Sequence, residues 1–155
     1  MSLLPLTAPD SDIKKLVVAW TELLASEDYQ GALALIGPAS EAHDWTPASL
    51  KACINGYGVV DVDEQTLRDL LDEYEVSAFT ITSLRERPDR ERIIEDAIEV
   101  DRENLYGMRA DRYLGMVHFT DLPLSGYLSD LTARFNIVKA GQNRLALEFI
   151  DIHVM

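Results

Sequence analysis

The sequence is poor in cysteine and in basic side chains. Cys53 is the single cysteine of the 155 residues, so one chain can form neither an internal disulfide nor a zinc site built from cysteines. Lys and Arg number 14 against 27 Asp and Glu, which gives a formal net charge of −13. Nucleic-acid binding and polybasic membrane anchoring both require a surface rich in Lys and Arg. Neither nucleic acid nor a membrane is therefore expected as a partner.

Long apolar stretches are also missing. No run approaches the roughly 18 residues of a membrane-spanning helix, and the apolar start of the chain lacks the basic region of an export signal. With the lone cysteine, these absences predict a cytoplasmic protein. We expect residues 1–9 to be a flexible leader and residues 10–155 to form a single domain, because 47% of the side chains are apolar and no linker-like stretch interrupts the chain.

Hydrophobic spacing predicts helices in the first half of the chain. Apolar residues recur at intervals of three and four from Ile13 to Leu24, which places them on one stripe of an amphipathic helix. Further helices are predicted at 27–36, 46–57 and 63–74. The clearest start is Thr46 as N-cap with Pro47 at the first helical position.

Alternating polarity with β-branched and aromatic residues predicts strands in the second half, at 76–84, 113–121, 130–138 and 144–154. In the strand 130–138, the inward side chains are expected to be Leu131, Ala133, Phe135 and Ile137, and the outward ones Thr132, Arg134 and Asn136. Residues 91–101 fit a helix and a strand almost equally, and a strand is favoured.

The last strand changes phase. Leu145, Leu147 and Phe149 share one parity, whereas Ile150, Ile152 and Val154 share the other. This pattern indicates either a β-bulge near 148–150 or a central strand covered on both faces. Both interpretations place the C-terminus in the interior.

Together these elements predict an α+β fold in which N-terminal helices pack on one face of a three- to five-stranded antiparallel sheet. We expect the helical stripe of Leu16, Val17, Trp20 and Leu24 to pack on Leu131, Phe135 and Leu147.

Three short motifs resemble an uncharacterised bacterial domain family. They are Tyr57-Gly58 after a helix, Ser129-Asp130-Leu131-Thr132 at a strand start, and the ending Ile150-Asp151-Ile152-His153-Val154. The family pattern has a Trp-Thr-Glu-Glu-Glu-Gly run before the Ser-Asp-Leu-Thr motif, and residues 119–127 depart from it. No activity is established for the family, so the resemblance implies a fold and a bacterial origin. More loosely, the order of elements resembles the cone-shaped fold of nuclear transport factors and ketosteroid isomerases, which encloses a pocket.

Few residues suggest catalysis. His118 and His153 fall on predicted strands near acidic residues, and with Asp130 they could form an acid/base pair or a metal site if neighbouring strands bring them together. The more ordinary interpretation makes both histidines structural or surface residues and makes Asp130 a partner of nearby backbone amides. No spacing typical of metal ligands is present, and no cofactor or metal is expected.

The strongest local charge lies between residues 61 and 75. Its candidate partner-binding residues are Asp61, Asp63, Glu64, Asp69, Asp72 and Glu73, relieved only by Arg68. They form either a solvated helix face that favours solubility or a docking surface for a basic partner.

Two functional hypotheses follow. The preferred one is a small acidic protein-binding module that neutralises a basic partner such as a toxin enzyme. The alternative is an isomerase-like or ligand-binding protein with a pocket that uses His118, Asp130 or His153. A homodimer assembled through the sheet is a third possibility, and on balance the sequence leans away from an enzyme.

Overall fold

The computed structural model describes residues 1–40, 44–102 and 111–155. Its helices are α1 (Asp10–Ala25), α2 (Tyr29–Leu35), α3 (Pro47–Asn55), α4 (Glu64–Tyr74) and α5 (Arg90–Ala97). Its strands are β1 (Leu4–Pro5), β2 (Ile98–Asp101), β3 (Tyr113–Phe119), β4 (Pro123–Leu124), β5 (Tyr127–Leu128), β6 (Leu131–Lys139) and β7 (Arg144–Val154). His43, the third histidine of the chain, and Gly107 lie outside the described residues.

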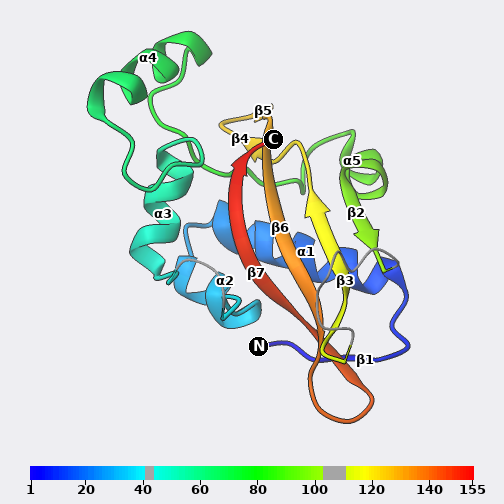
Figure 1. Ribbon diagram of the computed structural model, residues 1–155. Helices are drawn as coiled ribbons and strands as arrows, with labels where there is room; N and C mark the ends of the chain where they lie inside the picture. The colour runs from blue at the N-terminus through cyan, green and yellow to red at the C-terminus, as the bar shows by residue number, and fades with distance from the viewer. Residues whose placement is uncertain (41–43, 103–110) are drawn as a thin grey trace.

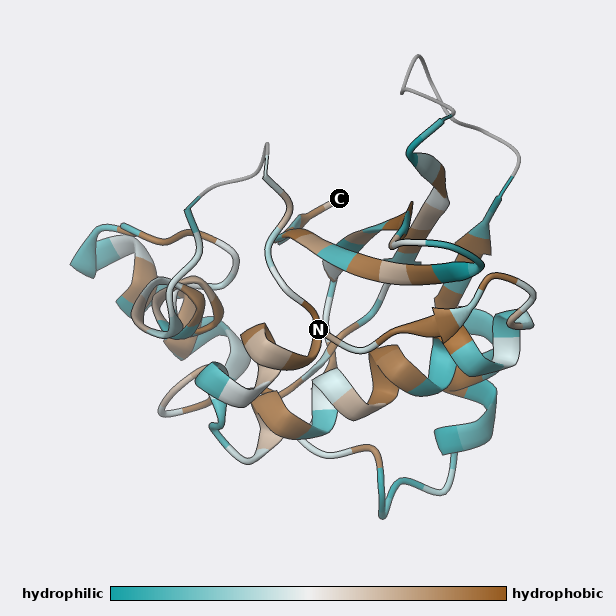
Figure 2. Ribbon diagram, turned by 90° about the horizontal axis from the view of Figure 1, so that it is seen from below, coloured by the Kyte–Doolittle hydropathy of each residue, from teal (hydrophilic) through white to brown (hydrophobic). Residues whose placement is uncertain are grey.

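The main sheet has five strands in the order β1-β7-β6-β3-β2, and every neighbouring pair is antiparallel. The helix α1 crosses behind the sheet, while α2 and α3 flank it on the β7 side (Figure 1). Viewed from below, α1 lies along one side of the curved sheet (Figure 2). This arrangement confirms the predicted α+β fold with N-terminal helices on an antiparallel sheet.

The core lies between α1 and the sheet. Trp20 contacts Phe135 edge-on with ring centroids 5.0 Å apart and lies 5.4 Å from the ring of Phe149. The rest of the predicted α1 stripe belongs to the same buried cluster as Leu131 and Leu147. Burial of such side chains removes apolar surface from water, which stabilises the folded state by about 25 cal/mol per Å² of that surface. The predicted packing of α1 on β6 and β7 is confirmed.

The start of α3 follows the sequence prediction. The Thr46 side chain accepts from the Ser49 backbone N–H at 3.1 Å, and the Ser49 hydroxyl oxygen accepts from the Thr46 N–H at 2.9 Å. This reciprocal capping box satisfies two amides that the helix cannot pair internally, and Pro47 needs no such partner. The local sequence therefore determines where α3 begins.

A β-bulge explains the phase change of β7. Phe135 pairs with Phe149, but Arg134 pairs with Asp151, so Ile150 is the extra residue. The bulge places Phe149 and Ile152 on the same face of the sheet although their parities differ. Asp151 and His153 are thereby directed to the opposite face, together with Arg134. Of the two interpretations of the sequence pattern, the structure shows the bulge.

Two predicted strands are corrected. Residues 76–84 form no strand beyond one isolated bridge between Ile81 and Leu124, although Phe79 and Ile81 are buried as the alternation indicates. The segment runs beside β4, which is only two residues long and offers no ladder to join. Residues 91–97 belong to α5, and residues 98–101 form β2. The favoured strand interpretation is wrong up to Ala97, because Ile93 and Ala97 are buried one helical turn apart.

The termini differ from expectation as well. Residues 1–9 were expected to be a flexible leader, but Leu4–Pro5 form β1 and pair with β7 at Leu145 and Arg144. Proline is tolerated there because β1 is an edge strand. At the other end, β7 is interior only as far as Ile152, since Val154 and Met155 are exposed. The prediction of a C-terminus in the interior is therefore wrong for these last two residues.

The outward side of β6 is more shielded than expected. Thr132 and Asn136 were expected to face solvent, and both are buried, whereas Arg134 is half-buried. The Asn136 amide oxygen is buried with no hydrogen-bond partner among the described residues. Within the described residues, no helix has both the length and the apolar composition needed to cross a membrane.

Candidate functional site

The three motifs that carry the family resemblance meet at one end of the sheet. The Tyr57 hydroxyl donates a hydrogen bond to the Asp130 carboxylate, across 73 residues of sequence. A side-chain carbon at Gly58 would lie 3.0 Å from Leu131 Cδ2 and 3.4 Å from His153 Cα. Thr132 of the second motif pairs in register with His153 of the third. Motifs that are distant in sequence therefore form one contiguous structure.

Tyr57 is held in an unusual conformation. It follows α3 with φ of 54°, a left-handed position where glycine is usual, and Gly58 next to it has φ of 88°. The Gly58 N–H bonds to the Cys53 carbonyl at 2.8 Å and the Tyr57 N–H to the Ile54 carbonyl at 3.2 Å. These bonds close the helix in a Schellman motif. They also direct the Tyr57 ring toward the start of β6.

The Tyr57 hydroxyl lies in a small polar network. It is 2.9 Å from the Tyr74 hydroxyl and donates to Asp130. Burial raises the pKa of Tyr57 well above its usual value, and the hydrogen bonds to Asp130 and Tyr74 raise it further. The phenol therefore stays protonated and serves as a donor, not as a base.

Aromatic rings surround this network. The ring of Tyr57 lies 5.3 Å from that of Tyr74 and 5.0 Å from that of Phe79, and the Tyr74 and Phe79 rings are 5.8 Å apart. Tyr127, on the hairpin formed by β4 and β5, lines a shallow hollow with Tyr57 and Tyr74. We call Tyr57, Tyr74, Phe79, Tyr127 and Asp130 the tyrosine junction. Through it, the last turn of α4 is attached to the sheet.

A row of polar residues crosses the face of the sheet opposite α1. Glu99, His118, Arg134 and Asp151 occupy successive strands in paired positions. The Arg134 guanidinium makes two parallel bonds to the Asp151 carboxylate, at 2.9 and 2.7 Å. Such a fork geometry fixes both side chains. His118 therefore neighbours a cation whose charge is already compensated.

His153 adds a second partner to Asp151. Its Nδ1 lies 3.1 Å from the Asp151 carboxylate. Burial raises the pKa of Asp151, but the hydrogen bonds and charge of Arg134, with His153, outweigh burial and hold this pKa below its usual value. Asp151 is therefore a fixed anion that orients both Arg134 and His153.

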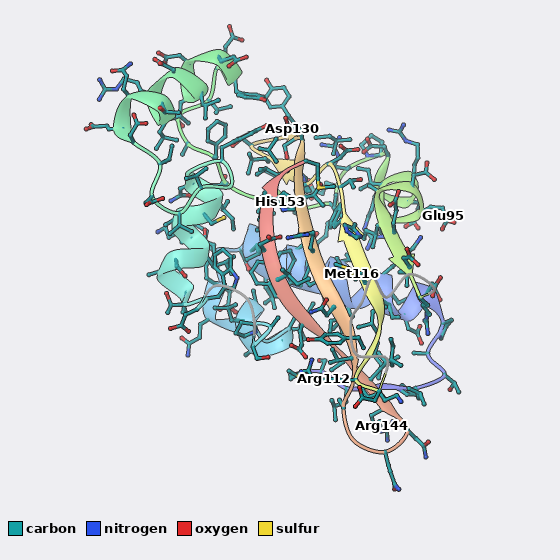
Figure 3. The ribbon with its side chains drawn as sticks, viewed as in Figure 1. Glu95, Arg112, Met116, Asp130, Arg144 and His153 are labelled. Carbon is teal, nitrogen blue, oxygen red and sulfur yellow. The ribbon has the colours of Figure 1, made fainter. Side chains whose placement is uncertain are left out.

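The three candidate catalytic residues do not contact one another. Asp130 accepts from Tyr57, and His153 bonds to Asp151. His118 lies two strands from His153, and strand spacing puts their Cα atoms on the order of 12 Å apart. Asp130 and His153 lie at the same end of the sheet (Figure 3), yet each has its own partner. The expected contact of Asp130 with nearby backbone is made instead by Ser129, whose hydroxyl accepts from the Leu131 N–H at 3.2 Å.

The described part of the chain offers no grouped metal ligands and no activated cysteine. There, no three His, Cys, Asp or Glu side chains are grouped as a metal site requires. Cys53 is buried on α3, where burial, aided by the charge of Asp151, raises the pKa of its thiol to about 12. A thiol with so high a pKa is not a nucleophile at neutral pH.

The acidic residues predicted to bind a partner lie on α4 and the loop before it, and all six are exposed. Three have local roles. Asp63 caps α4 by accepting from the Thr66 N–H at 2.9 Å, Glu64 pairs with Arg68 at 3.0 Å, and Asp69 accepts from Gln65 at 2.8 Å. Hydrogen bonds from Thr66, mainly from its side-chain hydroxyl, lower the pKa of Asp63. The other three, Asp61, Asp72 and Glu73, have no bonded partner among the described residues.

One feature had no signal in the sequence. A groove of about 800 Å³ runs between α1 and α5, above the apolar side chains of Val18 and Ile94. Its charged walls neutralise each other, since Lys14 lies 3.9 Å from the Glu95 carboxylate and Arg85 lies 3.5 Å from that of Glu22. Opposite charges on two helices far apart in sequence cannot be paired by spacing alone.

Among the described residues, the acidic side chains of α4 and the loop before it are thus the part of the candidate site that is exposed and only partly paired. Comparison of the chain with protein-family models, with curated proteins and with solved structures finds no match in any of the three.

Proposed function

We propose that the protein is a binding module for a basic protein partner. The contact region is the α4 acidic surface, which comprises Asp61, Asp63, Glu64, Asp69, Asp72 and Glu73. The observation that carries this proposal is the position of α4. The helix extends away from the sheet (Figure 1), and none of its residues is buried. Its acidic side is therefore available along its full length.

Charge supports the same partner class. Between residues 61 and 75 there are seven acidic side chains and one basic one, Arg68, and Arg68 is paired with Glu64. A dense field of one sign attracts an oppositely charged protein and speeds its association. A neutraliser of a basic enzyme, which acts by covering that enzyme's surface, would use such a field.

The alternative, an isomerase-like or ligand-binding protein, has less support. It needs His118, Asp130 or His153 inside a cavity, but Asp130 and His153 bond to Tyr57 and Asp151, and His118 lies two strands from His153. The described groove lies between α1 and α5, on the other side of the sheet from His118 and His153.

The test starts from a random-sequence peptide display library, with the full chain as bait. We expect enriched peptides to carry net positive charge. The most enriched peptide is then synthesised as a soluble probe, and its affinity is measured for the triple variant Asp69→Lys, Asp72→Lys and Glu73→Lys. Binding should weaken at least tenfold with an unchanged melting temperature, because these side chains are exposed.

A charge-matched control separates location from total charge. The variant Glu86→Lys, Glu91→Lys and Asp96→Lys changes three exposed acidic residues around α5 by the same amount. It should alter affinity less than threefold. Equal weakening by both variants, or enrichment of peptides without positive charge, would contradict the proposal.

A further inference from the structure

Exposed apolar side chains gather at the end of the sheet where β6 begins and β7 ends. They are Val59, Val60, Tyr127, Leu128, Val154 and Met155, and we call them the apolar end surface. Tyr127 is the largest ring among them and is 58% exposed. Apolar side chains that gather on a surface, rimmed by polar ones, are typical of protein interaction sites.

Contacts join these segments into one surface. Gly58, which precedes Val59, lies against Leu131 and His153, and Leu131 pairs with Val154. Tyr127 lines the same hollow as Tyr57, which donates to Asp130. Figure 3 shows Asp130 and His153 at this end of the sheet. Residues from four parts of the chain therefore surround Asp130.

Asp130 supplies an uncompensated charge at this surface. The residue is exposed, and one carboxylate oxygen is occupied by the Tyr57 hydroxyl. Among the described residues, no Lys or Arg forms an ion pair with it. Arg87, which donates to the Gly126 carbonyl of the β4–β5 hairpin at 3.2 Å, is itself paired with Asp89 at 2.9 Å. The second oxygen of Asp130 is therefore available to a cation from outside.

Tyr57 connects Asp130 to the exposed ring of Tyr127, because it donates to the carboxylate and lines one hollow with that ring. A carboxylate and a ring connected in this way suit one kind of side chain. A guanidinium or ammonium group can stack on a tyrosine ring while it bonds to a carboxylate. Tyrosine and arginine are also the residue types that contribute most to binding at protein interfaces. The acidic residue Asp61 follows Val60 directly, so the rim of the surface favours positive charge as well.

We propose that the apolar end surface and Asp130 receive a basic segment of the partner. One Arg or Lys of that segment stacks on Tyr127 and bonds to Asp130, and its apolar neighbours cover Val59, Val60 and Leu128. This inference rests on the proposed function and refines it. The α4 acidic surface attracts the partner, whereas this end of the sheet determines which basic sequence binds.

The test uses two variants with little effect on the fold. Tyr127→Ser removes an exposed ring, and Asp130→Asn keeps an oxygen that can accept from Tyr57. The probe is the most enriched basic peptide from the display experiment, and calorimetry gives its affinity. Each variant should bind the peptide at least tenfold more weakly than wild type, while urea unfolding midpoints stay close to wild type.

Peptides in which each Arg is replaced in turn by citrulline, or each Lys by norleucine, identify the contact. One replacement should weaken binding to wild type at least tenfold and binding to Asp130→Asn less than threefold. If every replacement weakens both proteins equally, or if Tyr127→Ser binds normally, the inference is wrong. The proposed function then still stands, provided that reversal of charge on α4 weakens the same peptide. If that reversal has no effect while Tyr127→Ser does, α4 is not the docking surface and the proposed function fails instead.

Discussion

At the scale of single residues, Tyr57 is the most informative position. A non-glycine residue with positive φ carries a backbone cost of roughly 1 kcal/mol, and Tyr57 adopts φ of 54°. Its ring and hydroxyl offset this cost through Tyr74, Phe79 and Asp130. The tyrosine therefore connects the end of α3, the end of α4 and the start of β6.

Tyr57→Phe tests the hydroxyl alone. Hydrogen bonds to charged groups contribute about 1.5–3 kcal/mol to stability, and water can replace part of this at an exposed carboxylate. We expect the free energy of unfolding to fall by about 1–2 kcal/mol in urea titrations. Tyr127→Phe is the matched control, because no hydrogen bond of the Tyr127 hydroxyl is found among the described residues, and it should change stability by less than about 0.5 kcal/mol. Equal effects of the two variants would show that the hydrogen bonds of the Tyr57 hydroxyl do not stabilise the fold.

Individual residues also show which features of the site can be predicted from the sequence. The Thr46 cap was predictable because it depends on neighbours within a turn of helix. The bond from Tyr57 to Asp130 was not, since it spans 73 residues and depends on how α3 meets the sheet. The acidic residues of α4 were identified from local charge alone. Tyr74 and Tyr127, which complete the site, carried no such signal.

At the scale of elements, the bulge in β7 decides which face each side chain occupies. One extra residue, Ile150, allows Ile152 to join the core and directs Asp151 toward Arg134. The alternation of the sequence indicated this bulge because parity is a local property. The same kind of alternation wrongly predicted a strand at residues 76–84, because a strand also needs a neighbouring strand with which to pair, and β4 has only two residues. Partner length is a property of the fold, not of the segment.

The pair of Arg134 and Asp151 makes the link between β6 and β7 sensitive to acid. The folded pKa of Asp151 is lowered, so the unfolded chain takes up this proton first as the pH falls, near a pH of about 4. Its contribution to stability is complete above that pH and is lost as the pH drops through the folded pKa. We expect Asp151→Asn and Arg134→Gln each to flatten the decline of the urea midpoint between pH 5 and pH 3. A decline as steep as that of wild type in both variants would contradict this account.

At the scale of the whole molecule, the densest charge and the apolar end surface lie on different elements. The net charge is −13, and its densest part lies on α4, whereas the apolar end surface lies where β6 begins and β7 ends. Charge acts over a Debye length of about 10 Å at 0.1 M salt and about 30 Å at 0.01 M. Apolar contacts act only once surfaces touch. The two surfaces should therefore control different steps of binding.

Salt dependence separates these steps. With the enriched basic peptide as probe, stopped-flow measurements should show the association rate of wild type falling about tenfold between 10 and 200 mM NaCl, because salt screens the attraction from α4. The variant with Asp69, Asp72 and Glu73 changed to lysine should associate slowly and show a shallow dependence on salt. Tyr127→Ser should keep the slope of wild type but dissociate faster, because it loses a contact formed only in the complex. If Tyr127→Ser changed the association rate and left dissociation unaltered, the division of roles between α4 and the end of the sheet would be wrong.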